Sequence, residues 1–212
     1  MSVITIITPV YNDWDAFALL VAEIDAVAGE NNFRAKIIAV NDGSVSVPEM
    51  SFWGENLAGI EIMHLSRNLG HQRSIAVGLS ALNKRGNVDA PIIVMDCDGE
   101  DRPADIPRLL AEYDLHPDEI IFAQRARRSE GFFFKIFYKL FKLIFRGLTG
   151  SGISFGNFSL IPPEKLEQIV YFQEIWNHFA AGIMHSNLKR RTIPTDRGKR
   201  YAGKSHRSED HT

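Results

Sequence analysis

The stretch PIIVMDCDGED at 91–101 decides the fold of this chain. Its first five residues are apolar and predict a buried strand, and its last six begin with two carboxylates one residue apart, Asp96 and Asp98. In open α/β sheets, ligands bind outside the carboxyl ends of the strands. Asp96, Asp98 and Glu100 offer the oxygen ligands that suit Mg²⁺ or Mn²⁺, which would bridge to a substrate diphosphate. The alternative is an acidic turn in which Gly99 supplies a positive φ.

The composition is that of an ordinary globular protein. The chain has 212 residues, enough for one α/β domain, with 45% hydrophobic and 24% charged residues. A net charge of −2 gives no argument for nucleic-acid binding. The single cysteine, Cys97, excludes an internal disulfide and fits a reducing compartment. No secretion signal or uninterrupted apolar span is visible, so we expect a cytosolic or cytosol-facing protein.

Strand and helix patterns alternate along the first part of the chain. Apolar β-branched runs predict strands at 3–8, 35–40, 60–65, 91–95 and 119–123. Helical spacing of apolar residues predicts helices at 14–29, 70–82 and 105–113. This alternation predicts an α/β fold, with a mostly parallel sheet covered by helices on both faces.

The composition changes after this core. Residues 132–146 form an aromatic, basic helical pattern whose cations share one face, as in an interfacial membrane helix or a core or oligomer-contact helix. These cations are Lys135, Lys139, Lys142 and Arg146. A glycine-rich loop at 147–156, a short strand at 157–161, a helix at 174–188 and a basic segment from 189 are expected to follow. The last residues, 208–212, have the composition of a disordered end. We interpret 1–130 as a ligand-binding core and 131–212 as the rest of the same domain.

Polar clusters follow three of the predicted strands, at 8–13, 41–44 and 96–98. In a parallel sheet these loops emerge at one edge and can meet at one ligand. The ring of Tyr11 can stack on a base, and Asp42 can accept hydrogen bonds from a ring N–H or from ribose hydroxyls. Asp42 followed by Gly43 is also an ordinary turn pair.

Four motifs together carry a family resemblance. TPVYND at 8–13, VNDGS at 40–44, LSRNLG at 65–70 and VMDCD at 94–98 resemble, in order and spacing, the family-2 glycosyltransferases with the GT-A fold. The resemblance extends over roughly residues 3 to 125. Within that family the chain is most similar to the polyprenyl-phosphate sugar transferases of the dolichol-phosphate mannose synthase type.

The resemblance implies an enzyme of the hexosyltransferase type that transfers sugar, with inversion, from a nucleotide-diphospho-sugar. Several positions take implied donor-site roles: Pro9, Tyr11 and Asp13 border the nucleobase and ribose, Asp42 binds the nucleobase, and Asn68 and Gly70 line the pocket, with Arg67 ordering these loops. Asp96 is implied beside the ribose and the metal, and Asp98 as a metal ligand. Glu100 stands where relatives often have Gln and is a candidate third ligand.

Cations in the second part match acceptor-side positions of the same relatives. Arg125 matches a phosphate-binding arginine, and Arg200 and Lys204 lie in a run, 197–205, that resembles a mobile acceptor loop; a solvated basic tail is the alternative. A lipid phosphate is already an anion and needs cations rather than a general base, whereas a hydroxyl acceptor needs a base. Asn157 replaces an Asp that is common in relatives, which leaves the acceptor open and Asp101 as a spare carboxylate.

The sequence thus predicts sugar transfer to polyprenyl phosphate at the cytosolic membrane face. Transfer to a glycan hydroxyl, or a non-catalytic nucleotide-sugar-binding module of a membrane complex, are the alternatives. A nucleotidyltransferase is disfavoured, because 8–13 lacks the Gly-rich basic signature expected there. A homo-oligomer or a membrane partner is left open. Relatives usually continue into hydrophobic anchor segments, whereas this sequence ends at Thr212, which fits either a longer natural chain or reliance on a partner.

Overall fold

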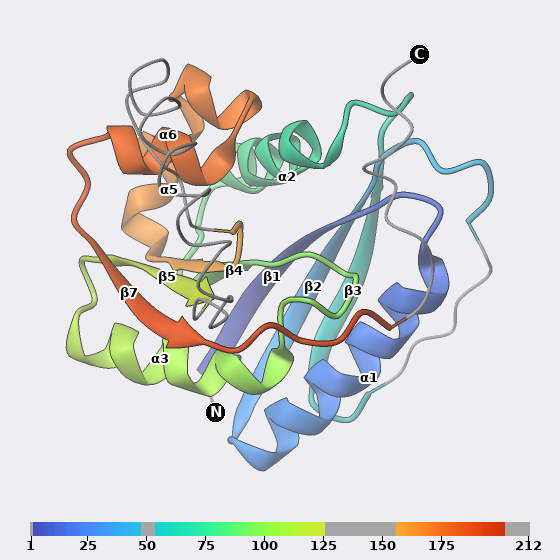
Figure 1. The fold of residues 1–212 in the computed structure, drawn as a ribbon, viewed down its shortest axis with the longest axis horizontal. Coiled ribbons are helices and arrows are strands. Elements are labelled where there is room, and N and C mark those ends of the chain that lie inside the picture. The colour runs from blue at the N-terminus through green and yellow to red at the C-terminus, as the bar shows by residue number, and fades with distance from the viewer. Residues whose placement is uncertain (1, 48–53, 126–155, 202–212) are drawn as a thin grey trace, which may run out of the picture.

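A seven-stranded sheet with helices on both faces forms the body of the protein (Figure 1). The computed structural model describes residues 2–47, 54–125 and 156–201. The strands are β1 (Ser2–Val10), β2 (Phe33–Asn41), β3 (Leu57–His64), β4 (Ile92–Val94), β5 (Ile120–Arg125), β6 (Ser159–Ile161) and β7 (Arg190–Thr195). The helices are α1 (Trp14–Glu30), α2 (His71–Arg85), α3 (Ile106–Leu115), α5 (Pro163–Val170) and α6 (Phe179–His185), with 3-10 turns η1 (Pro103–Asp105) and η2 (Gln173–Trp176).

The strand order places β1 in the interior of the sheet, third of its seven strands. The order is β3-β2-β1-β4-β6-β5-β7, and β6 alone runs antiparallel to its two neighbours. The strand order reverses direction at β1, because β1 pairs in parallel with β2 on one side and with β4 on the other. A crevice at such a switch point, beyond the carboxyl ends of the strands, is where doubly wound sheets bind ligands.

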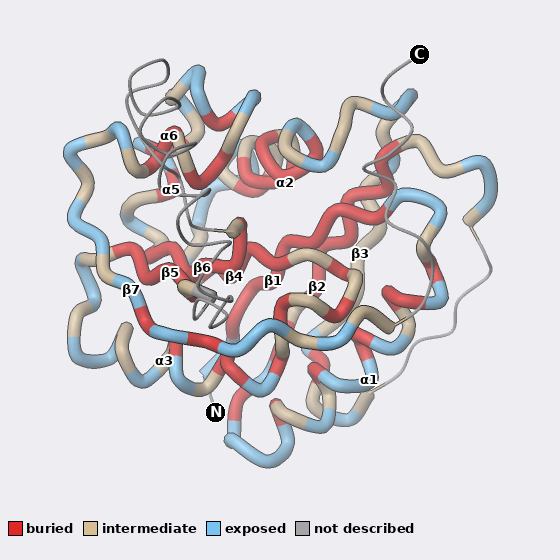
Figure 2. Tube along the Cα trace, viewed as in Figure 1, coloured by how far each residue is buried: buried red, intermediate tan, exposed pale blue. Residues whose placement is uncertain are grey.

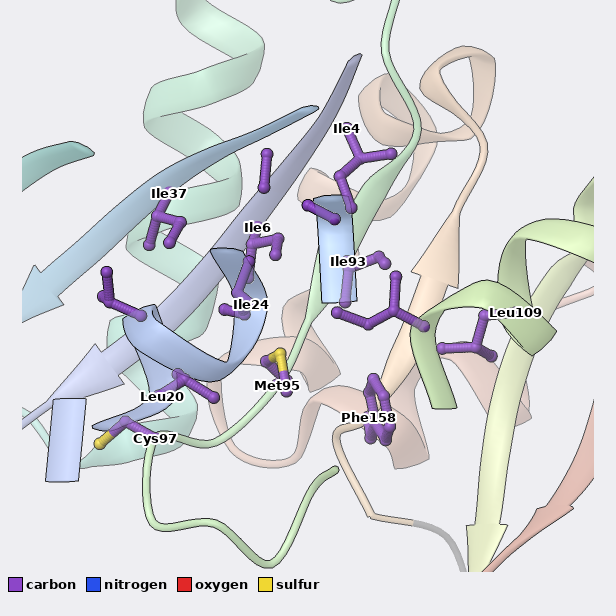
Figure 3. Close-up of a cluster of buried hydrophobic side chains, with 14 of the residues drawn as sticks. Ile4, Ile6, Leu20, Ile24, Ile37, Ile93, Met95, Cys97, Leu109 and Phe158 are labelled. Atoms are coloured by element: carbon purple, nitrogen blue, oxygen red, sulfur yellow. The ribbon is translucent and has the colours of Figure 1, made fainter. Parts of the chain in front are cut away.

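Two hydrophobic cores lie on opposite faces of the sheet (Figures 1 and 2). Side chains alternate along a strand, so Ile6 of β1 faces α1 and α3 while its neighbour Ile7 faces α2. Figure 3 shows the first core, whose labelled side chains include Leu20 and Ile24 of α1, Ile6 of β1 and Ile37 of β2. The predicted α/β class, with a mostly parallel sheet and helices on both faces, is confirmed.

Helix α1 forms where the apolar spacing predicts it. Its residues Phe17, Leu20, Val21, Ile24 and Ala28 recur at helical intervals and are all buried. The helix follows the loop after β1, so the direction of β1 and the packing of α1 together fix where that loop lies. The first core therefore supports the loop after β1 at the carboxyl edge of the sheet.

The second part of the chain differs from expectation in three places. The predicted single helix at 174–188 is wrong: η2 ends at Trp176, and α6 begins after His178, whose Nδ1 accepts a hydrogen bond from the backbone N–H of Ala181 at 3.3 Å. Helix α5 was not predicted. The segment at 190–195, predicted as part of a basic loop, is strand β7, in which Ile193 and Thr195 are buried while their neighbours face outward.

Some predictions concern residues outside the described part of the chain. These are the basic helix at 132–146, most of the loop at 147–156, and the disordered end at 208–212. Of the helices that the structure describes, none is both long and apolar enough to cross a bilayer.

Candidate functional site at the carboxyl edge of the sheet

The loops after β1 and β2 are tied to each other at the carboxyl edge. The backbone N–H of Asn12 donates to Ser44 Oγ at 3.0 Å, and Asn12 Oδ1 accepts from the backbone N–H of Val45 at 2.9 Å. Asn12 adopts a left-handed conformation, with φ of 51°, which asparagine tolerates better than most residues. Tyr11, directly after β1, is 37% exposed, so its ring is accessible to a stacking partner.

Asp42 joins the β2 loop to the segment that leads into α2. One carboxylate oxygen accepts from the backbone N–H of Leu69 at 2.7 Å, and the other accepts from that of Gly70 at 2.9 Å. The two loops approach so closely that a Cβ at Gly43, where φ is +73°, would lie 2.6 Å from the backbone of Arg67. Asp42 is only 2% exposed. Its carboxylate orders this corner of the site, and its predicted contact with a nucleobase stays a prediction.

The acidic loop after β4, residues 96–102, is held in shape by its own carboxylates. Asp101 Oδ2 accepts from the backbone N–H of Asp96 at 2.9 Å, and Asp98 Oδ1 accepts from that of Glu100 at 2.9 Å. Asp101 is 3% exposed and is therefore engaged in the loop rather than displayed to solvent. Asp96 and Asp98 are both partly exposed at the carboxyl edge.

A C-terminal strap, residues 196–201, lies along this acidic loop. The backbone N–H of Gly198 donates to the carbonyl of Glu100 at 2.9 Å, and that of Tyr201 donates to the carbonyl of Asp98 at 3.0 Å. Gly99 makes the approach feasible, since a Cβ there would lie 2.8 Å from the carbonyl oxygen of Lys199. Figure 1 shows the strap continuing from β7 towards α1.

Two arginines of the strap face the acidic loop. Arg197 forms an ion pair with Glu100, and Arg200 Nη2 lies 3.6 Å from Asp98 Oδ2. Beyond them, burial and the Glu23 carboxylate raise the pKa of the Tyr201 phenol, whose ring packs against the first core. The strap therefore brings two cations of the predicted acceptor run next to two predicted metal ligands.

Cys97 lies between the two aspartates but points into the protein (Figure 3). It is 7% exposed, and burial raises the pKa of its thiol strongly, with further contributions from the carboxylates of Asp13, Asp96 and Asp98. β1 and β4 are adjacent parallel strands, so the loops that follow them emerge side by side, as the sequence predicts.

Asn157 lies next to Asp96 and belongs to a chain of hydrogen bonds that continues to Gln72 and Phe179. Its Nδ2 donates to Asp96 Oδ1 at 3.3 Å, and its Oδ1 accepts from Gln72 Nε2 at 3.0 Å. Gln72 Oε1 in turn accepts from the backbone N–H of Phe179 at 2.6 Å. Gln72 was not predicted as a site residue, because no local pattern in the sequence pairs it with a residue so far along the chain.

Asp96 and Asp98 fit a hard divalent cation in the chemistry of their donors. Both present carboxylate oxygens at the carboxyl edge, and Mg²⁺ typically binds one or two carboxylates together with phosphate oxygens of its substrate. Glu100, the third predicted ligand, is ion-paired with Arg197. Within the described ranges, no group of three or more His, Cys, Asp or Glu side chains is placed to hold a metal ion.

Four other predicted site residues differ in how far the structure describes them. Pro9 is buried in β1, and Asn68 accepts a hydrogen bond from the backbone N–H of Gly70 at 2.9 Å. For Arg125 the structure describes only the backbone, at the end of β5 opposite Thr195. Lys204 lies outside the described residues.

Comparisons with solved structures agree with this architecture. The chain superposes on Staphylococcus aureus TarS 1–349 with a TM-score of 0.52 at 15% identity, covering 91% of this chain and 58% of that one. The same protein in complex with UDP-GlcNAc gives a TM-score of 0.53 at 13% identity, covering 94% and 60% of the two chains. At such identities the likeness shows the fold alone, which is GT-A.

Curated relatives match at higher identity. A dodecaprenyl-phosphate galacturonate synthase of Rhizobium johnstonii is 25% identical, over 62% of this chain and 38% of its own. An uncharacterized glycosyltransferase, YkcC of Bacillus subtilis, is 26% identical over 95% and 62%, respectively. An undecaprenyl-phosphate 4-deoxy-4-formamido-L-arabinose transferase of Klebsiella pneumoniae is 27% identical over 71% and 45%.

The chain spans between 38% and 62% of the length of these three relatives. The family model described as glycosyl transferase family 2 matches residues 5–186, which include every loop described above except the strap. From this match and the GT-A architecture, we conclude that the chain belongs to glycosyl transferase family 2.

Proposed function

We propose that this chain transfers a sugar from a nucleotide-diphospho-sugar to a polyprenyl phosphate, with a divalent cation on Asp96 and Asp98. The observation that carries the proposal is the meeting of Asp98 with Arg200 of the strap, at 3.6 Å. Such a site offers carboxylates for a cation that neutralises a diphosphate and an arginine for a second phosphate. Two of the relatives are named as polyprenyl-phosphate transferases, which supports the choice of acceptor.

The donor would lie at the carboxyl edge of the sheet, beyond β1 and β2. Tyr11 is exposed there for stacking on the base, and the buried Asp42 holds the loop that carries Asn68. The family match and these convergent loops support a nucleotide in this place. Mg²⁺ or Mn²⁺, when bound, would neutralise the charge that develops on the leaving diphosphate.

The acceptor phosphate would approach from the side of the strap. One of its anionic oxygens forms a bond to the anomeric carbon while the bond from that carbon to the diphosphate oxygen breaks, and the nucleoside diphosphate leaves with the electron pair. This single displacement inverts the anomeric configuration and requires no general base. Arg200, together with the predicted ligands Arg125 and Lys204, would position the phosphate.

Neither of the two candidate bases that the structure describes suits a hydroxyl acceptor. Asn157 cannot act as a base because its side chain is a neutral amide. The other candidate, Asp101, is 3% exposed and accepts the backbone N–H of Asp96. A lipid acceptor also supports the cytosolic membrane face as the working location, together with the predicted basic face of 132–146.

The proposal is tested by calorimetric titration of the purified chain with UDP- and GDP-sugars, in Mn²⁺ and in EDTA. We expect one nucleotide to bind in Mn²⁺ and to lose most of its affinity in EDTA. Undecaprenyl phosphate is then added, with the unphosphorylated polyprenol as its control, and release of nucleoside diphosphate is measured. Only the phosphorylated lipid should accept the sugar.

Asp98→Asn provides the matched test of the metal assignment. It should reduce Mn²⁺-dependent donor binding at least about tenfold, since it removes one carboxylate ligand. Asp89→Asn, an exposed aspartate away from the site, should bind as the wild type does. Equal donor binding by both variants would contradict the assignment of Asp98 as a metal ligand. Donor binding by the wild type without sugar transfer would indicate a non-catalytic nucleotide-sugar-binding module.

A further inference from the structure

A chain of two side-chain amides connects Asp96 to the start of α6. It runs from the backbone N–H of Phe179 to Gln72 Oε1 (2.6 Å), from Gln72 Nε2 to Asn157 Oδ1 (3.0 Å), and from Asn157 Nδ2 to Asp96 Oδ1 (3.3 Å). Asn157 is 6% exposed, so its amide has little access to water. The connected residues come from α2, from the segment before β6, and from α6.

The direction of this chain follows from donor and acceptor chemistry. A backbone N–H only donates, so the oxygen of the Gln72 amide must face Phe179 and its NH₂ must face the other way. The NH₂ of Gln72 lies within hydrogen-bond distance of His71 Nε2 and of the Asn157 amide, and because it only donates, Asn157 Oδ1 must face it and Asn157 Nδ2 must face Asp96. A carboxylate only accepts, so Asp96 completes the series without conflict.

We propose that Asn157 is a positioning residue for Asp96 and that Gln72 sets the orientation of Asn157. This inference rests on the proposed function, in which Asp96 serves the donor and its cation. The backbone of Asp96 is fixed by Asp101, and its side chain is fixed by Asn157, so both parts of the residue are ordered. An ordered carboxylate loses less conformational entropy when it binds a ligand.

The same contacts give position 157 a role that a carboxylate could not fill. An aspartate there would place two acceptors against each other at the distance where Asn157 now donates to Asp96. Gln72, which bonds Asn157, is the residue that reaches α6. Asn157 therefore acts on the donor side, by orienting Asp96, rather than as a base for the acceptor.

The test measures Mn²⁺-dependent binding of UDP and GDP by calorimetry, using whichever nucleotide the wild type binds. Gln72→Met keeps the length of the side chain and removes its three hydrogen bonds, to Phe179, Asn157 and His71. We expect about a tenfold loss of affinity, the scale of one hydrogen bond to a charged group. Gln168→Met, on an exposed face of α5, is the matched control and should bind as the wild type does.

A double-mutant cycle separates positioning from a general effect on folding. Asn157→Leu should weaken nucleotide binding to a similar degree, and Gln72→Met with Asn157→Leu should weaken it no further, because Gln72 acts through Asn157. Urea midpoints of all variants are measured alongside, and the loss of affinity should persist where the chain is fully folded. Gln72→Glu is a second variant at this position. Its carboxylate can accept from Phe179 but cannot donate to Asn157, so it should bind nucleotide as weakly as Gln72→Met does.

The outcomes are distinct. If the wild type binds a nucleotide and Gln72→Met binds it equally well, the positioning role is overturned and the proposed function stands. Additive losses in the double variant would overturn the route through Asn157. If the wild type binds neither UDP nor GDP in Mn²⁺, the proposed function fails and the positioning role fails with it.

Discussion

Several carboxylates at the candidate site accept hydrogen bonds from backbone N–H groups. Asp42 accepts two backbone N–H groups, Asp101 accepts that of Asp96, and Asp98 accepts that of Glu100. Charged acceptors make strong hydrogen bonds to backbone amides, so these residues order the loops in which they stand. The same side chains were singled out in the sequence for ligand chemistry. A substitution at any of them will therefore change loop order as well as binding.

Asp42→Asn tests this double role at a single residue. The amide has one acceptor oxygen, so its NH₂ would face one of the two N–H donors at Leu69 and Gly70. We expect a loss of about 1–3 kcal/mol in the free energy of unfolding, measured by urea denaturation. Asp89→Asn, which is exposed, should change it by less than about 0.5 kcal/mol. Equal stabilities of the two variants would contradict the structural role of Asp42.

Cys97 gives a prediction about reactivity. Burial and the neighbouring carboxylates of Asp13, Asp96 and Asp98 raise the pKa of its thiol, so the folded protein holds less thiolate at a given pH than an ordinary cysteine would. Thiolate is the nucleophile, so alkylation by iodoacetamide at about pH 8 should be at least about 100-fold slower in the native protein than in urea. Mass spectrometry follows this single site. Similar rates in the two states would show that the thiol is accessible when folded.

At the scale of elements, the strap and the acidic loop form one unit. Two backbone hydrogen bonds and three arginine–carboxylate contacts join them, the third between Arg102 and Asp196. Arg200 and a divalent cation would both be attracted by Asp98, and they repel each other. The arginine must therefore withdraw from this carboxylate, at least in part, when the predicted metal binds.

Arg200→Ala should consequently raise the affinity for Mn²⁺ in the absence of nucleotide, by roughly threefold to tenfold. The gain is measured by titrating free Mn²⁺ with electron paramagnetic resonance. Lys199→Ala, next to it in the strap and exposed, is the matched control and should bind Mn²⁺ with nearly wild-type affinity. Unchanged or weaker Mn²⁺ binding by Arg200→Ala would show that the arginine does not compete with the metal.

At the scale of the whole molecule, a single sheet is shared by two cores. Phe17 belongs to the core under α1, and Phe179 belongs to the core under α6, while β1, β2 and β4 contribute to both. Strands from the second part of the chain, β6 and β7, are members of the same sheet. We therefore expect residues before and after position 130 to unfold together.

Phe17→Leu and Phe179→Leu test that expectation. Each should lower the free energy of unfolding by about 1–2 kcal/mol, because both side chains are fully buried. Urea unfolding is followed by far-UV circular dichroism and by fluorescence, including that of Trp14, whose ring lies 5.7 Å from that of Phe17. The two transitions should coincide in the wild type and in Phe179→Leu. A second transition in Phe179→Leu that leaves the fluorescence change untouched would indicate separate units.

Local signals in the sequence determined the first half of the protein. The apolar runs that became β1, β2 and β4 are long enough to predict buried strands, and the helical spacing of Phe17, Leu20 and Ile24 predicts α1. Parallel strands put their carboxyl ends at one edge, so the meeting of the loops that contain Tyr11, Asp42 and Asp96 follows from pattern alone.

The sequence predicted β6 in the second half, but α5, β7 and the detailed contacts of the site were decided by the tertiary structure. Strand β7 has only Ile193 as a strongly apolar buried residue, and it exists because β5 offers an edge for pairing. The ion pair of Arg197 with Glu100 and the chain from Phe179 through Gln72 and Asn157 to Asp96 join residues far apart in sequence. Such pairs are set by how the sheet brings distant loops together, and no local periodicity encodes them.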